Sequence, residues 1–581
     1  MIVLGISAFF HDSAAALLVD GEVIAAAQEE RFSRIKHDAA LPVQAARFCL
    51  EQAGLAIEDV DHVIFYEKPL RKLERLLVTH LREFPFGLAQ FPRAMATWLG
   101  QRLWIERDLC KGLGCRQDQL LFCEHHLSHA ASAFFSSPFE SAAVVTADGV
   151  GEWATTSIYR ARSDASGSTV ELLEELHFPH SIGLFYSALT AYLGFEVNEG
   201  EYKVMGLAAY GQPRYLDALE KICAVSDDAS LTIDERYFCY QRHPTKSFTP
   251  ALEALLGPAR QPGAPLALPA RTAEDQRFAD IAASLQQLTE RYMLGLARRA
   301  HALTGERSLC LAGGVALNCV ANRRVQVEGP FERLFVQPAA GDAGGALGAA
   351  QWATHVLHAQ PRRAPMRHAF LGAAWAPDDI AAFLRDCGVE HSVFVDRALL
   401  ADEVARLLAD QQVGGWFQGR FEWGPRALGA RSIVADPRDP KAQDRVNRKI
   451  KFRERFRPFA PAVLAEEADA WFDVDADADL LSPFMCSVVP VREHTRQALP
   501  AVTHVDGTAR VQVVREHDNP TFHALVSAFR RRTGVGVVLN TSMNLKDEPL
   551  CASPAEAYAV FARSDLDFLV LENCLIQRRP T

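Results

Sequence analysis

Several patterns that would assign this chain of 581 residues to a protein class are absent. No stretch of ~18 residues is continuously apolar, so we expect no membrane-spanning helix. The twelve cysteines include no Cys-x-x-Cys pair, which argues against a thiolate zinc site and favours reduced thiols in a cytoplasmic protein. The net charge of −11 disfavours a general nucleic-acid or membrane-surface binder, because both need a basic face.

The common nucleotide-binding motifs are missing as well. Neither Gly-x-x-x-x-Gly-Lys-Ser/Thr nor Gly-x-Gly-x-x-Gly occurs, so any nucleotide is held in another way. The chain opens Met-Ile-Val-Leu-Gly-Ile-Ser, which has no basic region before its apolar residues, and it turns polar at His11 and Asp12. This predicts a strand and not a signal peptide.

The chain does contain the composition of a folded globular protein, with 49% hydrophobic and 23% charged residues. Its length predicts two to four domains, and residues 360–365, rich in Pro and Arg, are the best linker. A strand, small-residue turn and strand open the chain at residues 2–19. The same order returns at residues 142–159, which suggests an internal duplication.

Two histidines at helical spacing are the first candidate site. Alanines in residues 126–136 predict a helix, so His125 and His129 lie one turn apart on one face, where two imidazoles can share a metal. Asp148 ends the apolar run 142–147 and could reach the same ion. A helix end with solvated histidines is the alternative, and the pair alone does not decide between them.

A basic segment in the second half is the other candidate. Between residues 449 and 459 basic and apolar side chains alternate, so an extended segment would bury Ile450, Phe452 and Phe456 and present five cations on one face. In an acidic protein such a face favours a di- or triphosphate ligand over a nucleic-acid groove. An amphipathic edge strand is the alternative.

Several short motifs occur in a fixed order along the chain. They are Gly5-Ile6-Ser7 to Ser13, His125-x-x-x-His129, Asp148-Gly149-x-Gly151-Glu152, Glu199-Gly200-Glu201-Tyr202-Lys203-Val204-Met205-Gly206, Ala312-Gly313-Gly314-Val315-Ala316-Leu317-Asn318, Gly341-Asp342, Gly424-Pro425-Arg426-Ala427-Leu428-Gly429 and Arg457-Pro458-Phe459. With these motifs, nearly the whole chain resembles the O-carbamoyltransferase family that acts on nodulation factors and antibiotics. One departure is Met543, where an aromatic residue is expected.

The resemblance implies an α/β protein with two domains. Residues 1–360 would form an actin-like ATPase domain, a duplicated ribonuclease-H-like fold, and residues 366–581 a twisted-sheet domain that makes carbamoyl adenylate from carbamoyl phosphate and ATP. The first domain would pass the carbamoyl group to a hydroxyl of a small-molecule acceptor, such as a sugar or an antibiotic precursor. A sugar or metabolite kinase of the actin-like fold and a nucleotide-switch module are the alternatives.

The resemblance also implies roles for individual residues. His11 would be the base near the acceptor hydroxyl. One divalent metal, with iron(II) favoured and manganese or zinc possible, would be held by His125, His129, Asp148 and Asp342, while Mg²⁺ would accompany ATP. Adenylate would contact Asp12, Ser13, Gly149, Glu152, Lys203, Gly313, Gly314, Asn318 and Gly341. Carbamoyl phosphate and ATP would contact Arg426, Lys449, Arg453, Arg457, Arg510, Asn540 and Ser542. The acceptor, the number of subunits and the roles of residues 70–110 and 213–270 stay unassigned.

Overall fold

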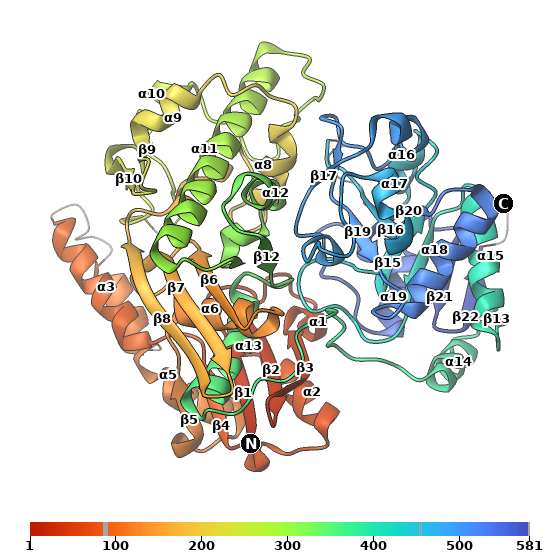
Figure 1. Cartoon of the computed structure of the whole chain (residues 1–581), viewed down its shortest axis with the longest axis horizontal. Coiled ribbons are helices and arrows are strands. Elements are labelled where there is room, and N and C mark those ends of the chain that lie inside the picture. The colour runs from red at the N-terminus through yellow and green to blue at the C-terminus, as the bar shows by residue number, and fades with distance from the viewer. Residues whose placement is uncertain (85–90, 101, 244, 452–453, 455, 579–581) are drawn as a thin grey trace. The chain divides into compact units, whose positions relative to one another are not determined.

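The computed structural model describes residues 1–84, 91–100, 102–243, 245–451, 454 and 456–578. This part of the chain is mixed α/β and forms two compact units (Figure 1). Unit 1 comprises Met1–Ile24 and Ala40–Pro365, and unit 2 comprises Ala25–Ala39 and Met366–Thr581. The units depart from the sequence-based division in one main place, because the short segment Ala25–Ala39 belongs to unit 2. None of the described helices is both long and apolar enough to cross a membrane.

Unit 1 contains two five-stranded sheets with the same strand order, β3-β2-β1-β4-β5 and β8-β7-β6-β11-β12. In each sheet the central strand is antiparallel to the next strand in the chain and parallel to a later one. This repeat confirms the predicted duplication and the actin-like ATPase fold. The strands are β1 (Ile2–Ser7), β2 (Ala14–Val19), β3 (Glu22–Gln28), β4 (His62–Phe65), β5 (Leu120–Phe122), β6 (Ser141–Ala147), β7 (Ala154–Asp164), β8 (Gly167–His177), β11 (Ser308–Ala312) and β12 (Arg333–Val336). The division between the units falls within β3, because residues 25–28 are assigned to unit 2.

Two helices, α6 (His125–Ser136) and α13 (Asp342–Trp352), pack against each other and against these sheets. Helix α13 contacts β1 and β2, while α6 contacts β6 and β11. A Cβ atom added to Gly348 would lie 1.8 Å from the Ser128 carbonyl oxygen, and one on Gly5 would lie 1.9 Å from the Ala346 carbonyl oxygen. The small residues of α13 therefore allow a backbone approach that brings the first turns of both helices together.

Unit 1 also contains further helices besides α6 and α13. The region around residues 70–110, to which the sequence assigned no role, includes α3 (Pro69–Arg82), α4 (Phe91–Gly100) and α5 (Ile105–Leu113), with residues 85–90 and 101 outside the described part. Helix α11 (Ala273–Thr304) begins at a capping box of Thr272 and Asp275 and packs on β6 and β7 (Figure 1). The others are α2 (Val43–Ala53), α7 (Ile182–Tyr192), α8 (Glu201–Ala208), α9 (Leu216–Ile222), α10 (Pro250–Leu256) and α12 (Cys319–Glu328), with the strands β9 (Cys223–Val225) and β10 (Leu231–Ile233).

Unit 2 is built on one eight-stranded mixed sheet in the order β13-β22-β21-β14-β15-β20-β16-β19. The strands are β13 (Ser392–Val393), β14 (Gly414–Phe417), β15 (Arg431–Ala435), β16 (Ala460–Leu464), β19 (Gln512–Val514), β20 (Val537–Ser542), β21 (Phe568–Leu571) and β22 (Cys574–Gln577), and a separate pair is β17 (Val489–Pro490) with β18 (Thr508–Ala509). The helices are α1 (Glu30–Ser33), α14 (Pro377–Asp386), α15 (Arg397–Ala409), α16 (Ala442–Val446), α17 (Ala468–Trp471), α18 (Pro520–Thr533) and α19 (Pro554–Ala562).

Candidate metal centre and cationic site

Four metal-type side chains converge in unit 1 from three parts of the sequence. His125 and His129 stand on the first two turns of α6, Asp148 follows β6, and Asp342 is the first residue of α13. One ligand atom from each lies within 4.8 Å of the other three. The structure therefore brings together the whole predicted metal set.

The spacing of these atoms fits a single ion. The His125 and His129 Nε2 atoms are 3.2 Å apart, and their distances to the nearest Asp148 and Asp342 oxygens run from 2.9 to 3.8 Å. In a tetrahedral site with bonds of ~2.1 Å, neighbouring ligand atoms are ~3.4 Å apart. Two imidazole nitrogens and two carboxylates form a mixed donor set that suits iron(II), manganese or zinc.

The charges in this cluster are strongly coupled. Burial lowers the pKa of His129, but hydrogen bonds to Asp148 and Asp342 and the charges of these carboxylates outweigh it and raise the pKa to about 9. Burial raises the pKa of Asp148, yet its hydrogen bonds with His125 and His129 bring it well below the usual value. The two carboxylates thus attract positive charge into this largely buried cluster, whether from protons or from a cation.

His11 lies at the edge of the same cluster. Its Nδ1 is 2.9 Å from Asp12 Oδ2, and its Nε2 is 3.9 Å from Asp342 Oδ2. Burial lowers the pKa of His11, but the charge of Asp342 and the hydrogen bond to Asp12 raise it to about 10. Tyr66 Oη donates a hydrogen bond of 3.4 Å to the same Asp342 oxygen. The predicted base and the predicted ligand set are therefore neighbours.

Glu152, predicted to contact adenylate, faces two helix N-termini. Its Oε1 accepts hydrogen bonds from the backbone N–H of His125 at 3.0 Å and of Lys68 at 2.7 Å. An anionic acceptor is favoured at such positions, because the first N–H groups of a helix have no partner within the helix. Glu152 is thus placed to orient the first histidine.

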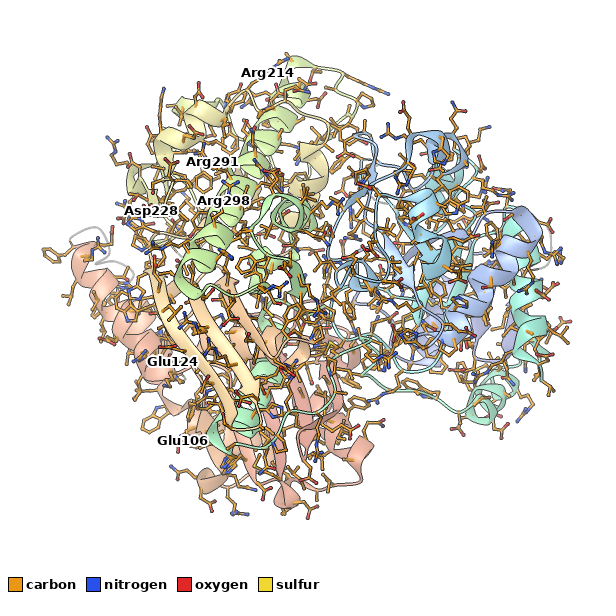
Figure 2. The ribbon with its side chains drawn as sticks, viewed as in Figure 1. Glu106, Glu124, Arg214, Asp228, Arg291 and Arg298 are labelled. Atoms are coloured by element: carbon orange, nitrogen blue, oxygen red, sulfur yellow. The ribbon has the colours of Figure 1, made fainter. Side chains whose placement is uncertain are left out.

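Sequence reasoning missed a set of cations on α3 that hold the residues beside the metal-type ligands. Arg75 donates 2.5 Å to the carbonyl oxygen of Gly151, and Lys72 pairs at 2.6 Å with the buried carboxylate of Glu67. Glu124, labelled in Figure 2, accepts from two more of them and directly precedes His125. We call this set the basic stripe, comprising Lys68, Arg71, Lys72 and Arg75. Its i, i+3, i+4 and i+7 spacing is the one signal that could have revealed it.

The glycine turns predicted to contact adenylate surround Asp148. The Gly314 N–H donates to Asp148 Oδ1 at 3.0 Å, and a Cβ on Gly313 would lie 2.3 Å from the Ala147 carbonyl oxygen. Gly149 O accepts from Ser181 Oγ at 2.7 Å. The rest of the predicted set lies at the N-cap of α12 (Asn318), at the N-cap of α13 (Gly341), on α8 (Lys203) and beside or near His11 (Asp12 and Ser13).

The basic segment of unit 2 corrects a prediction of local structure. The extended conformation predicted from residue 449 is wrong at its start, because residues Asn447–Lys451 continue α16 as a π-helical turn, η7. Lys449 and Lys451 therefore do not share an extended face. Ile450 and Phe456 are buried as predicted, whereas Phe452 and Arg453 lie outside the described residues.

The two lysines bind different parts of unit 2. Lys449 Nζ lies 2.6 Å from Asp567 Oδ1 and donates to the Asp565 carbonyl oxygen. Lys451 is buried, and its Nζ donates to Asn544 Oδ1 at 2.7 Å and to Ser542 Oγ at 3.1 Å. Lys449 is thus engaged by carboxylate and carbonyl oxygens. Lys451, one of the five cations of the basic segment but not a predicted ligand, holds the predicted ligand Ser542.

Arg426 lies in the loop of residues 424–429, which a side chain of strand β20 contacts through a hydrogen bond. Asn540 Nδ2 donates 3.2 Å to the Ala427 carbonyl oxygen, so two of the predicted ligands are neighbours. Arg426 is buried, with Nη1 3.7 Å from Cys486 Sγ. Arg457 pairs with Glu454 at 3.7 Å, and the charge of Arg510, together with burial as the larger cause, lowers the pKa of His504 to about 4.

Two family descriptions match the chain. "Carbamoyltransferase N-terminus" matches residues 2–351 and "Carbamoyltransferase C-terminus" matches residues 405–578. The first match alone covers more than half of the chain and includes His11 and all four metal-type ligands. The second includes the loop of Arg426 and the strand that carries Asn540 and Ser542.

Curated relatives agree with these matches. An uncharacterized protein of Synechocystis sp. is 45% identical over 99% of this chain and 96% of its own length. Nodulation protein NolNO of Sinorhizobium fredii is 39% identical over 98% of this chain and 79% of its own. A 3'-hydroxymethylcephem-O-carbamoyltransferase of Amycolatopsis lactamdurans is 39% identical over 46% of this chain and 48% of its own. The chain therefore belongs to the carbamoyltransferase family and is a transferase enzyme.

Proposed function

We propose that this carbamoyltransferase is ATP-dependent and acts in two steps. Unit 2 forms carbamoyl adenylate from carbamoyl phosphate and ATP, and unit 1 transfers the carbamoyl group from adenylate to a hydroxyl group. A carbamoyl carbonyl is a poor electrophile because its nitrogen donates electrons into it, so a good leaving group such as AMP is needed. This need for activation is the chemical reason for two separate sites in one chain.

The observation that carries the proposal is the convergence of His125, His129, Asp148 and Asp342 beside His11. A divalent cation held by these four residues would supply positive charge for the phosphate of the departing AMP and offset the carboxylate charge that raises the pKa of His11. The donor set suits iron(II), manganese or zinc, and we take iron(II) as the first candidate because the family resemblance favours it.

In the transfer step, the acceptor oxygen forms a bond to the carbamoyl carbon, and the bond from that carbon to the AMP phosphate oxygen breaks. The hydroxyl proton passes to Nε2 of His11, whose Nδ1 is held by Asp12 at 2.9 Å. The hydrogen bond to a carboxylate fixes the tautomer in which Nε2 is the acceptor. The N-terminus of α13 would provide further backbone N–H donors for the adenylate phosphate.

In the activation step, water first cleaves carbamoyl phosphate into carbamate and inorganic phosphate. An oxygen of the carbamate then bonds to the α-phosphorus of ATP as the bond from that phosphorus to pyrophosphate breaks, which gives carbamoyl adenylate. Arg426 and Arg510 are the cations that we assign to the leaving phosphates, with Asn540 and Ser542 as hydrogen-bonding groups. Arginine suits this role because its planar fork matches phosphate oxygens. Lys449, Arg453 and Arg457 stay predictions as ligands of the same site.

The acceptor that we propose is a hydroxyl of a small sugar-like or antibiotic-like molecule. The names of two relatives point to this class, since one is a nodulation protein and the other acts on a 3'-hydroxymethylcephem. Such a role would place the protein in the tailoring of natural products.

The proposal is tested by pyrophosphate release from ATP with purified protein supplied with Mg²⁺ and iron(II). We expect release that depends on carbamoyl phosphate, and its absence under these conditions would overturn the proposal. His11→Ala should abolish transfer to an acceptor, read by mass spectrometry of candidate hydroxylated metabolites, while leaving pyrophosphate release intact. A kinase would instead give a phosphorylated product, and a switch module would give no transfer to lose.

A further inference from the structure

Segment Ala25–Ala39 comes early in the chain but belongs to unit 2, and four of its residues anchor it there. The backbone N–H of Ala26 donates 3.2 Å to the carbonyl oxygen of Leu371. Phe32 meets the buried ring of Phe421 edge-on, with 6.1 Å between ring centroids. The segment is therefore packed into unit 2 as one of its elements.

The strongest anchor is Arg31, whose side chain is only 2% exposed. Its Nη2 donates 2.8 Å to the carbonyl oxygen of Gly424 and 3.0 Å to Gln28 Oε1, while Nη1 pairs at 2.5 Å with Glu30. Burying a guanidinium is costly unless its donors are paired, and these three contacts pair both Nη atoms while Nε has no partner among the described residues. The Gly424 carbonyl is the one that opens the loop carrying Arg426.

That loop, residues 424–429, depends on outside contacts for its shape. It begins and ends with glycines at positive φ, +102° at Gly424 and +99° at Gly429. Such residues have broad conformational freedom, so the loop is not fixed by its own backbone preferences. From the residues just before the loop, Glu422 Oε1 accepts from the N–H groups of Leu428 and Ala430, each at 2.8 Å. Arg31 supplies the contact at the other end.

Arg34 makes similar hydrogen bonds to a second loop, at residues 549–550. Its guanidinium donates to the carbonyl oxygens of Leu550 at 2.8 Å and Pro549 at 2.9 Å. The next residue, Cys551, donates its N–H to the Met543 carbonyl oxygen, directly after Ser542. The segment therefore contacts the loop that carries Arg426 and also the loop that is hydrogen-bonded beside Ser542. These are the two parts of unit 2 to which we assign carbamoyl phosphate and ATP contacts.

We propose that segment Ala25–Ala39 is an integral part of the adenylate-forming site, and that Arg31 is a positioning residue for the loop of Arg426. This inference rests on the proposed function of unit 2. It assigns a role to a segment that lies within the region matched by the N-terminal family description.

The test compares full-length Arg31→Met, Arg31→Lys and, as a matched control, Arg47→Met, whose arginine is 68% exposed on α2. Hydrogen exchange of peptides covering residues 422–432 and 141–160 is measured by mass spectrometry. We expect Arg31→Met to raise exchange at least tenfold in 422–432 and to leave 141–160 and the metal content unchanged. Equal exchange in 422–432 for Arg31→Met and the parent protein would overturn the inference.

Kinetics supply a readout that a merely structural role would not move. Arg31→Met should raise KM for carbamoyl phosphate or ATP in pyrophosphate release by ~10-fold or more, Arg31→Lys should be intermediate, and Arg47→Met should match the parent protein. A lower melting temperature with unchanged kinetic constants would contradict the positioning role. If the parent protein releases no pyrophosphate, the proposed function fails, while the exchange pattern still decides whether Arg31 holds the loop.

Discussion

The two predicted sites behave differently once the chain is folded. In unit 1, four ligands that lie as far as 217 residues apart in the sequence, from His125 to Asp342, meet within 4.8 Å. In unit 2, cations that lie within a few residues of one another separate, since Lys449 binds Asp567 and Lys451 binds Asn544. Closeness in sequence is thus a poor guide to a shared site, whereas side chains at the ends of adjacent sheet and helix elements converge.

The largest expected effect tests whether the four-residue cluster of unit 1 binds a metal. His129→Ala removes one of four donors, so we expect loss of bound metal and a fall in transfer of about 10³-fold, corresponding to about 4 kcal/mol. Metal content is measured by elemental analysis of the purified protein. His126→Gln is the control, because His126 is on the same helix but bonds to Thr146 instead. Full metal content in His129→Ala would contradict the assignment.

The unit 2 side of the comparison depends on Arg426. Arg426→Met should lower pyrophosphate release about 100-fold, because a charge-assisted hydrogen bond to phosphate contributes about 1.5–3 kcal/mol. Arg448→Met, which replaces an exposed arginine on η7, should stay within about twofold of the parent protein by the scale expected for surface substitutions. Similar rates for both variants would mean that the loop of residues 424–429 is not the phosphate site.

Glu152 tests whether the surroundings of the unit 1 ligands matter as much as the ligands. Glu152→Gln keeps one oxygen acceptor but loses the charge shared by the His125 and Lys68 amides, so we expect metal affinity to fall about tenfold. The dissociation constant is measured by competition with a chelator. Glu106→Gln, an exposed substitution on α5, is the control. An unchanged dissociation constant would limit Glu152 to a structural role.

The smallest expected effect concerns Lys449, and it tests whether this lysine contacts the ligand or only Asp567. Because its ammonium is already paired with Asp567, Lys449→Met should lower the free energy of unfolding by about 1 kcal/mol and change pyrophosphate release by no more than about threefold. Urea denaturation and steady-state kinetics give the two values. A tenfold rise in KM for ATP or carbamoyl phosphate would instead support Lys449 as a ligand.

Local pattern was enough to predict much of the fold. The strands of residues 2–7 and 14–19 and the helix from His125 appear where apolar spacing and small residues placed them. The return of the opening pattern at residue 142 predicted the duplication, which the repeated strand order confirms. These features depend on burial periodicity and turn chemistry within about ten residues, and such information is written along the chain.

Contacts between residues far apart in the sequence could not be predicted from local patterns and are known only from the tertiary structure. No spacing rule placed Arg75 against Gly151, because that contact depends on how α3 lies beside the turn after β6. The direction of Lys449 follows from α16 continuing into a π-helical turn, which an alternating pattern does not reveal. Segment Ala25–Ala39 joins unit 2 through single hydrogen bonds to residues almost 400 positions away, such as that from Arg31 to Gly424. Contacts of this kind form only after separate elements have packed together. The spacing of apolar residues within either element therefore does not predict them.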